Sequence, residues 1–598
     1  MIRYSVRLAD LNRHLFEVDC RLDEPGSEEI FSLPSWIPGS YLLREFARHV
    51  VRVRASSAGR EIAIEKIDKS SWRCRGAGED LTVTITVYAL DQSVRGAYLD
   101  GKRGFFNGPC LFLSAQGRET EPVEVSLVTP DDRRASAWKV ATSMTPIDID
   151  VRGYGRYEAG DYDELIDHPV EISDFVTASF EAGGKRHHLV LSGRHDTDLE
   201  RIVTDLTQLC ETQIRFFGNE PPFSEYRFLT LAVSNGYGGL EHRASSSLIT
   251  RRTDLPRIGE PGVPASYQRF LGLCSHEYFH NWNIKRIKPA EFSPYRLDRR
   301  NLTRQLWVFE GITSYYQDLF LLRSDLIGAK DYLTRLGLIM TRFYRAPGRH
   351  HQSLEESSFD AWDKLYKPEP NSINSTISYY SKGAVVALLL DLTLRAESSS
   401  KYSLDDVMSE LWTRYGESDS GVAEGAFEAL VEEVSGIPLG EFFDAAVRGK
   451  DELPLSDKLA EFGVVFSLRQ AADRDDPGGM KPTGRSETKL GLGAEFTDRE
   501  IGVLLTQVLE GGPAEGAGLV PGDHLLALDG KKVTGPDLKT TLSRYEDGAT
   551  ISANVFRDDE LLEVELVLQM EPATTVALEL DKEADADAIA RREQWLGC

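Results

Sequence analysis

The sequence HEYFH, residues 276–280, decides how the middle of this 598-residue chain is interpreted. His276 and His280 are four positions apart, so a helix would project both imidazoles from one face. Two imidazoles so placed can bind one zinc ion, and Glu277 would then lie beside the metal, where it can take a proton from bound water. Apolar residues at helical spacing before the motif predict a helix over about 264–284. The alternative is an ordinary helix with two surface histidines.

A catalytic zinc site needs a third protein ligand and a position left open for water, whereas four protein ligands would indicate a structural site. The segment LWVFEGITSYYQDLF, residues 306–320, offers Glu310 on a second predicted helix over about 301–324. This helix is apolar nearly all round, and a buried carboxylate needs a partner, for which a cation is well suited. The pattern therefore favours zinc bound by His276, His280 and Glu310, although a carboxylate on a helix surface is the alternative.

Composition and charge exclude several classes of function. Acidic residues outnumber basic ones, 95 to 69, which gives a net charge of −26. We therefore expect neither nucleic acid nor an anionic membrane as a partner, because both require a cationic face. The first residues alternate polar and apolar types, which predicts a strand and no signal peptide, and no apolar run approaches the ~18 residues of a membrane span. Six scattered cysteines without a C-x-x-C pair indicate free thiols, so we expect a cytoplasmic protein.

The chain divides into regions of different sequence pattern. Residues 1–172 contain short β-patterned runs between Gly, Pro and Asp turns, which predicts a β-sandwich-like domain. Residues 173–455 mix strands with long helices, residues 456–575 have short strands and paired glycines, and residues 576–598 form a tail. In the first region, SWIPGSYLLREF (35–46) has a Pro-Gly turn beside a Trp-Tyr cluster that we expect to be exposed.

Four separated motifs together resemble one family of enzymes. HEYFHNWN followed by WVFEGITSYY is similar to the gluzincin metallopeptidases, whose third ligand is a Glu in an E-G-x-x-x-Y helix. GYGGLEH (236–242) resembles the G-x-M-E-N strand of aminopeptidases related to leukotriene A4 hydrolase, with Leu240 for Met and His242 for Asn. ISYYSKGAVVALLLDL (377–392) resembles their Y-x-K-G helix. With the W-x-P-G-S-Y motif at 36–41 and a PDZ-like C-terminal region, the chain resembles the glycyl aminopeptidase family, peptidase family M61.

The resemblance implies a multidomain α+β fold. It has an N-terminal β-sandwich-like domain, a thermolysin-like and mostly helical catalytic domain, and a C-terminal PDZ domain. The implied activity is that of a zinc metallo-aminopeptidase, with one Zn²⁺ per chain, that hydrolyses the N-terminal bond of peptides with a free N-terminus. A preference for small residues, Gly or Ala, is implied by the family and not by any pocket visible in the sequence.

The resemblance also implies residue roles. His276, His280 and Glu310 match the family's zinc ligands, and Glu277 matches the general base that deprotonates a zinc-activated water. Tyr380 matches the donor that stabilises the tetrahedral oxyanion. Its neighbour Tyr379 would take that role if the alignment shifted by one residue.

Further matches concern the substrate. Glu241 matches the carboxylate that binds the free α-amino group, and such a fixed anion lets an exopeptidase count from the N-terminus; the alternative is an exposed strand residue. Gly238 and Gly239 would let the substrate backbone approach this strand closely. Two roles are open for His242, a hydrogen bond to the substrate backbone or support of another site residue.

The chain departs from the gluzincin pattern at one position. Many gluzincins have an acid four residues after the third ligand, where this chain has Ser314. The group that orients the zinc histidines is therefore open, and Asp318 is a candidate by proximity in sequence.

The C-terminal region, KLGLGAEF (489–496) and the G-P-A-x-x-A-G-L-x-x-G-D core that follows, resembles a PDZ domain. Gly491 and Gly493 match the loop whose backbone N–H groups bind a peptide's C-terminal carboxylate. The alternative is a domain that only packs on the rest of the chain. For the whole protein, a PDZ-guided zinc endopeptidase and a non-catalytic peptide-binding scaffold are the alternatives, and the sequence does not indicate an oligomeric state.

Overall fold

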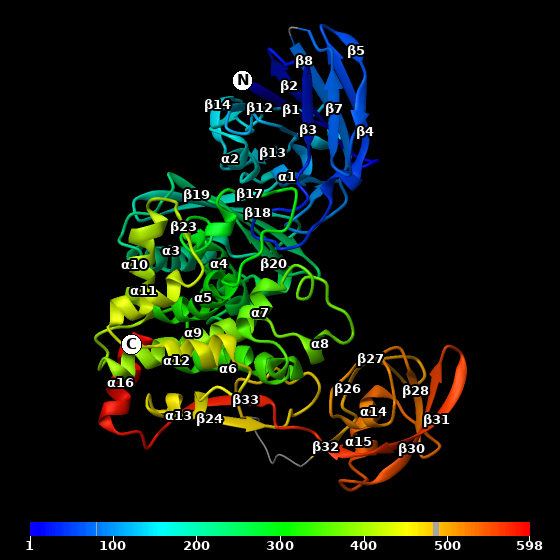
Figure 1. The fold of residues 1–598 in the computed structure, drawn as a ribbon, viewed down its shortest axis with the longest axis vertical. Helices are drawn as coiled ribbons and strands as arrows, with labels where there is room; N and C mark the ends of the chain where they lie inside the picture. The colour runs from blue at the N-terminus through cyan, green and yellow to red at the C-terminus, as the bar shows by residue number, and fades with distance from the viewer. Residues whose placement is uncertain (79, 482–488, 598) are drawn as a thin grey trace. The chain divides into compact units, whose positions relative to one another are not determined.

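The computed structural model describes residues 1–78, 80–481 and 489–597 (Figure 1). The chain forms two compact units. The first comprises residues 1–301, 323–327 and 408–423, and the second comprises residues 302–322, 328–407 and 424–598. The domain boundaries expected from the sequence remain predictions.

The N-terminal part of the first unit is β-rich, as expected. Its largest sheet has eight strands in the order β14 (Thr145–Ile149), β15 (Gly155–Ala159), β12 (Val123–Leu127), β1 (Ile2–Asp10), β2 (Leu15–Asp23), β8 (Asp80–Tyr88), β4 (Val50–Ser57), β5 (Arg60–Ile62). Two four-stranded sheets accompany it, β13 (Lys139–Ala141), β16 (Val170–Ser173), β10 (Arg103–Phe106), β9 (Ala97–Leu99) and β11 (Ser114–Ala115), β3 (Glu28–Ser32), β7 (Ser71–Arg75), β6 (Ile64–Lys66). Alternate side chains of β8 are buried, so one face of this strand lies on the core.

The expectation of an exposed Trp-Tyr cluster at the Pro-Gly turn is wrong. Trp36 and Tyr41 are both 0 % exposed. The indole Nε1 of Trp36 donates to the carbonyl of Arg296 at 2.9 Å, and both rings pack against Phe292. The turn is covered by a segment about 250 positions further along the chain, a contact that local sequence patterns do not reveal.

A second, five-stranded sheet follows in the first unit. Its order is β17 (Val176–Ala182), β18 (Lys185–Ser192), β19 (Glu225–Val233), β21 (Ser245–Arg251), β20 (Gly238–Glu241). Strands β18, β19 and β21 are parallel, and the edge strand β20 is antiparallel to β21. Helices α3 (Leu199–Phe216) and α4 (Ala265–Phe279) contact each other, and α4 also contacts β20 and β21. Leu240 of β20 belongs to the same hydrophobic core as the N-terminal sheets.

The second unit is mainly helical up to residue 460. The helix expected over 301–324 occurs as a π-helical turn, Trp307–Gly311, followed by α5 (Ile312–Arg323). The π-helical turn packs closely against α9 (Tyr379–Glu397). A Cβ on Gly311 of this turn would lie only 2.6 Å from the Cα of Gly383 in α9. The segment Ser372–Glu397 is apolar and long enough to span a membrane, but 83 % of its 18-residue apolar window is buried inside the protein, as is usual for a core helix.

The C-terminal part of the second unit contains a separate small sheet and a β-rich module with a six-stranded sheet. Strands β24 (Val464–Arg469) and β33 (Thr575–Leu580) pair before and after the module, and α16 (Ala586–Leu596) ends the described chain. The module contains β26 (Ala494–Asp498), β27 (Val503–Val508), β28 (His524–Leu528), β30 (Thr550–Arg557), β31 (Glu560–Val567), α14 (Pro513–Gly516) and α15 (Gly535–Leu542) around its own core.

The cysteines agree with the sequence-based expectation of free thiols. Cys20, Cys74, Cys110, Cys210 and Cys274 are buried and form no disulfide. The sixth, Cys598, lies outside the described residues.

Candidate active site

Helix α4 carries the H-E-x-x-H motif at its C-terminal end. Glu277 is 5 % exposed, and His280, the C-cap residue, is 1 % exposed, which contradicts a pair of surface histidines. The two imidazole centroids are 4.6 Å apart. The Nδ1 atom of His280 lies 2.8 Å from the carbonyl oxygen of Asn283. Because a carbonyl oxygen only accepts hydrogen bonds, Nδ1 carries the proton, and Nε2 has the lone pair that a metal would use.

The third expected ligand, Glu310, lies in the π-helical turn Trp307–Gly311 and is 2 % exposed. Single π-helical turns occur frequently at functional sites. One ligand atom each of His276, His280 and Glu310 lie within 4.8 Å of one another. Two imidazoles and one carboxylate form a donor set that suits zinc with a fourth position left for water.

Glu277 and Glu241 lie close to the same histidine. One ligand atom each of Glu241, Glu277 and His280 also lie within 4.8 Å of one another. Gly239 makes this approach possible, since a Cβ on it would lie 2.0 Å from Oε1 of Glu277. A Cβ on Gly238 would meet only Nη1 of Arg95, at 3.7 Å. Of the two glycines expected at this strand, Gly239 is therefore the one that close packing requires.

Glu241 is buried, not an exposed strand residue. It is 3 % exposed, and its Oε1 atom has no hydrogen-bond partner among the residues that the structure describes. A buried carboxylate oxygen without a partner is costly. Its position at the end of β20, beside Glu277 and His280, suits a cationic group of a substrate.

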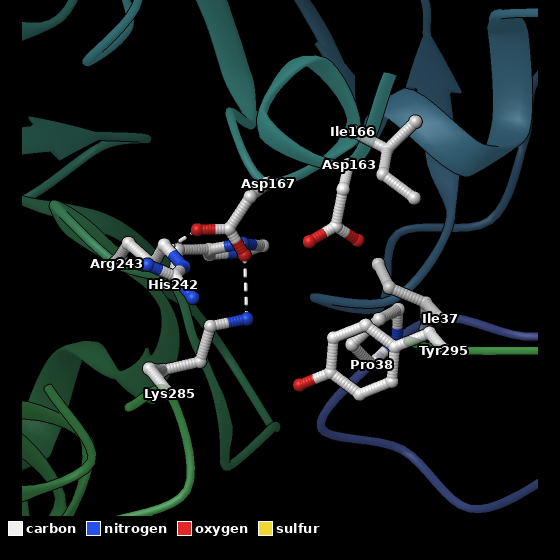
Figure 2. Close-up of a pocket in the computed structure, with 9 residues that line it drawn as sticks. All are labelled: Ile37, Pro38, Asp163, Ile166, Asp167, His242, Arg243, Lys285 and Tyr295. Carbon is white, nitrogen blue, oxygen red and sulfur yellow. Dashed lines mark hydrogen bonds and ion pairs between the residues drawn. The ribbon is translucent and has the colours of Figure 1, made fainter. Parts of the chain in front are cut away.

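His242, which follows Glu241 in the chain, belongs to a buried network with Asp167 and Lys285 (Figure 2). It is 1 % exposed, and its Nδ1 lies 3.5 Å from Oδ1 of Asp167. The same carboxylate accepts a 2.5 Å hydrogen bond from Lys285 and a 2.6 Å bond from the backbone N–H of Arg243. Ile37 and Pro38 of the Pro-Gly turn line the other side of this small cavity. Asp167 and Lys285 thus form a salt bridge that ties His242 in place.

Burial and neighbouring charges shift the pKa values of Asp167 and His242 in opposite directions. Burial alone would raise the pKa of Asp167, but Lys285 and His242 outweigh burial and hold it well below its usual range. Burial lowers the pKa of His242, and Asp167 only partly offsets this. At neutral pH the network therefore contains a charged Asp167 carboxylate and a neutral His242 imidazole.

Tyr380 is the second residue of helix α9, where the Ser378 hydroxyl caps the helix by accepting from the backbone N–H of Tyr380. Its hydroxyl lies 2.8 Å from that of Tyr366. Tyr379 is fully buried and donates to Tyr366 at 3.2 Å, whereas Tyr380 is partly exposed. Desolvation, followed by the nearby charge of Glu310, raises the pKa of Tyr380. The surroundings of the Tyr380 hydroxyl therefore include the zinc-ligand candidate Glu310.

Sequence reasoning missed two supports of this site and considered a third residue that has another partner. Asp318, considered as the partner of a zinc histidine, instead forms a 2.7 Å ion pair with Arg335. The orienting group of His280 is the carbonyl of Asn283, and no side-chain pattern could reveal a backbone acceptor. Tyr366, which bridges the two tyrosines, has no motif of its own.

The two glycines expected in the loop of the PDZ-like module lie at its first strand: Gly491 belongs to β25 (Leu490–Gly491), and Gly493 follows it. Gly493 has a φ of +65°, a backbone conformation that favours glycine, and a Cβ on Gly491 would lie 2.5 Å from Glu571. The edge strand β26 lies next to α15. Residues of the preceding segment contact both elements: Lys539 of α15 donates to the carbonyl of Ala472 at 2.9 Å, and Arg474 forms a 3.0 Å ion pair with Asp498 of β26.

Comparisons with known proteins show which families the parts of the chain resemble. The Peptidase M61 N-terminal domain model matches residues 3–174, the M61 glycyl aminopeptidase model matches residues 269–386, and a PDZ domain model matches residues 491–568. A crystal structure of an aminopeptidase N family protein from Idiomarina loihiensis is 39 % identical over 100 % of both chains, with a TM-score of 0.95.

Two more distant matches are partial. An M1 zinc metallopeptidase from Deinococcus radiodurans is 12 % identical, over 76 % of this chain and 94 % of that chain, with a TM-score of 0.48. A probable CtpA-like serine protease from Staphylococcus haemolyticus is 30 % identical over 79 residues, which are 13 % of this chain and 16 % of the relative. Neither match contributes to the argument for the site.

Proposed function

Because the chain belongs to the glycyl aminopeptidase family M61 and is a metallo-aminopeptidase, we propose that it removes small N-terminal residues from peptides at one zinc site. His276, His280 and Glu310 would hold the metal. The observation that supports this best is the approach of their ligand atoms to within 4.8 Å of one another, beside two buried carboxylates. The preference for Gly and Ala is inferred from the family.

Zinc at this site would lower the pKa of a bound water toward ~7 and polarise the scissile carbonyl. Glu277 acts as the general base, because its carboxylate lies beside His280 on the inner end of α4. Tyr380 donates its hydroxyl to the oxyanion of the tetrahedral intermediate. It is held for this by Tyr366 and by the Ser378 cap.

Glu241 binds the α-ammonium of the substrate. Its unpartnered, buried Oε1 and its position beside Glu277 support this role. A charge-assisted hydrogen bond between the ammonium and this carboxylate would place the first peptide bond, and no later one, next to the general base. His242 supports Glu241 indirectly, because its ring is tied to Asp167.

The experiment that tests the proposed activity is a scan of amino-acid p-nitroanilides with and without a chelator. We expect turnover to be highest with Gly and Ala, to be abolished by the chelator and to return with zinc. Glu277→Gln should retain its zinc and lose turnover by a factor of about 10²–10⁴, the usual contribution of a general base. A variant that retains wild-type turnover would contradict the role of Glu277.

The same assay separates the alternatives. A PDZ-guided endopeptidase would cleave N-acetylated peptides, whereas an aminopeptidase that requires Glu241 loses turnover when the amine is acetylated. A non-catalytic scaffold would bind peptides and cleave none. We also propose that the PDZ domain binds peptide C-termini at Gly491 and Gly493, which the position of β26 at the end of its sheet, among the described residues, supports.

A further inference from the structure

The turn Trp36–Tyr41 has no role in the proposed reaction so far, yet it is held firmly. Ser35 donates its backbone N–H to the carbonyl of Leu297 at 2.7 Å, and Trp36 donates to the carbonyl of Arg296 at 2.9 Å. The turn itself is closed by a 3.0 Å hydrogen bond from the N–H of Ser40 to the carbonyl of Ile37. A buried, anchored turn of this kind presents its central residue at a fixed position.

That central residue, Gly39, lies directly against the carboxylate of Glu241. A Cβ on Gly39 would lie 2.5 Å from Oε1, 2.7 Å from Oε2 and 2.7 Å from Cδ of Glu241. Gly39 also has a φ of +91°, which L side chains rarely adopt. Both the conformation and the lack of space therefore require glycine at this position.

Contacts on both sides restrict Glu241. Leu240, its neighbour in β20, is buried in the N-terminal hydrophobic core, and the backbone of Gly39 covers the end of the Glu241 side chain. A free glutamate side chain has several rotatable bonds, and restricting them before binding lowers the entropic cost of capturing a ligand. Among the described residues no hydrogen bond holds Oε1 of Glu241. Packing against the turn therefore restricts the carboxylate instead.

We propose that Gly39 is a positioning residue for the substrate's N-terminus. It fixes the Glu241 carboxylate at the place where the α-ammonium binds. This inference rests on the proposed function of Glu241 as the amine-binding group. It assigns the W-x-P-G-S-Y turn of the N-terminal β-rich region to recognition of the free amine.

The test compares Gly39→Ala with a matched control, Gly59→Ala. Gly59 is in the same β-rich region and has a φ of +74°, but a Cβ on it would have no atom within 4 Å. Both variants therefore place alanine at a positive φ and carry the same kind of backbone strain. Only Gly39→Ala also displaces the Glu241 carboxylate. The ligands are glycine hydroxamate and acetohydroxamate, which share the metal-binding hydroxamate and differ by the amine. Their dissociation constants are measured by calorimetry on zinc-loaded protein, with zinc content and melting temperature recorded for each variant.

We expect Gly39→Ala to weaken binding of glycine hydroxamate by about tenfold or more, the typical value of one charge-assisted hydrogen bond. Binding of acetohydroxamate should change by less than twofold, and Gly59→Ala should leave both constants unchanged. Equal weakening of both ligands by Gly39→Ala, or the same pattern in Gly59→Ala, would overturn the proposal.

A rescue variant distinguishes positioning from general damage. Glu241→Asp shortens the side chain by one methylene, so in Gly39→Ala it makes room for the added Cβ. The double variant should bind glycine hydroxamate more tightly than Gly39→Ala alone, and failure to do so contradicts the proposal. If Gly39→Ala does not fold, Trp36→Phe removes the anchor to Arg296 without adding atoms, and it should show the same selective loss.

Glu241→Gln distinguishes a failure of the proposed amine-binding role of Glu241 from a failure of the inference about Gly39. If this variant still prefers glycine hydroxamate over acetohydroxamate as the wild type does, the proposed function of Glu241 fails. If it loses the preference while Gly39→Ala retains it, only the inference about Gly39 fails.

Discussion

Gly239→Ala tests how closely Glu277 is packed against strand β20. Gly239 does not have a positive φ, so the strand backbone accepts alanine without strain. The new Cβ would lie 2.0 Å from Oε1, 2.3 Å from Cδ and 2.6 Å from Cγ of Glu277. Non-bonded carbon and oxygen atoms need more than about 3 Å, so the carboxylate must retreat by about 1 Å. Gly239→Ala therefore changes the position of the general base without changing its chemistry.

A displacement of 1 Å in a catalytic group costs about 10²-fold in rate, which corresponds to about 2.7 kcal/mol in activation free energy. We therefore expect kcat for Ala p-nitroanilide to fall by about 10²-fold, with KM changed by less than threefold. Zinc content, measured by elemental analysis, should remain that of the wild type because Gly239 contributes no ligand.

Gly440→Ala is the control for this experiment. Gly440 begins the short helix α12 (Gly440–Phe443), and a Cβ there would have no atom within 4 Å. This variant should retain wild-type kcat. The account of Glu277 is refuted if Gly239→Ala keeps more than a third of the wild-type kcat with its zinc retained, since the displaced carboxylate would then not be the base.

The remaining predictions concern the oxyanion, the amine, the buried ion pair and the metal. Tyr380→Phe should lower kcat by about 10²–10³-fold in steady-state assays, as for loss of an oxyanion donor, and Tyr379→Phe should have a smaller effect. Glu241→Ala should reduce turnover chiefly for substrates with a free amine. Lys285→Met leaves Asp167 buried without its main partner and should cost about 3–5 kcal/mol of stability at pH 7 in denaturant unfolding. Chelation should abolish turnover and lower the melting temperature, because zinc binds the folded state.

The pH dependence of the stability of Lys285→Met follows from the opposing effects of burial and of Lys285 on the pKa of Asp167. In the wild type the pKa of Asp167 is lowered, so its stabilising contribution is present above the unfolded value near 4 and is lost as pH falls through the lower folded value. In Lys285→Met burial remains and raises this pKa, so protonation at lower pH restores stability. The deficit of the variant relative to the wild type should therefore shrink between pH 7 and pH 5.

Each of these outcomes can contradict the account. A larger loss for Tyr379→Phe than for Tyr380→Phe would exchange the two roles. Equal loss on free and acetylated substrates would refute amine binding by Glu241. A stability deficit of Lys285→Met that is constant or grows as pH falls would contradict the assignment of a charged Asp167.

Much of the fold could be predicted because its signals are local. The helix over about 264–284 was predicted from apolar spacing, and α4 covers Ala265–Phe279. The run LTVTITVYAL alternates in type, and β8 covers Asp80–Tyr88 with alternate residues buried. The π-helical turn before α5 was not predicted, because its hydrogen-bond pattern leaves no distinct periodicity in five residues.

The sequence predicts the reacting groups of the site, but not the contacts that hold those groups in position. The spacing of HEYFH and the isolated acid Glu310 in an apolar helix indicate zinc chemistry directly. The contact of Gly39 with Glu241 joins residues about 200 positions apart through backbone atoms. Likewise, the burial of Trp36 depends on Phe292 and Arg296. Such contacts depend on tertiary packing, which neither motif nor periodicity records.

The central claim is that one zinc ion is bound by His276, His280 and Glu310. The most direct test is a crystal structure of the zinc-loaded protein with diffraction measured on both sides of the zinc absorption edge. We predict one anomalous peak per chain, at about 2.0–2.2 Å from a nitrogen of each histidine and an oxygen of Glu310. A peak without Glu310 among its ligands, or no peak at the two histidines, would contradict the account.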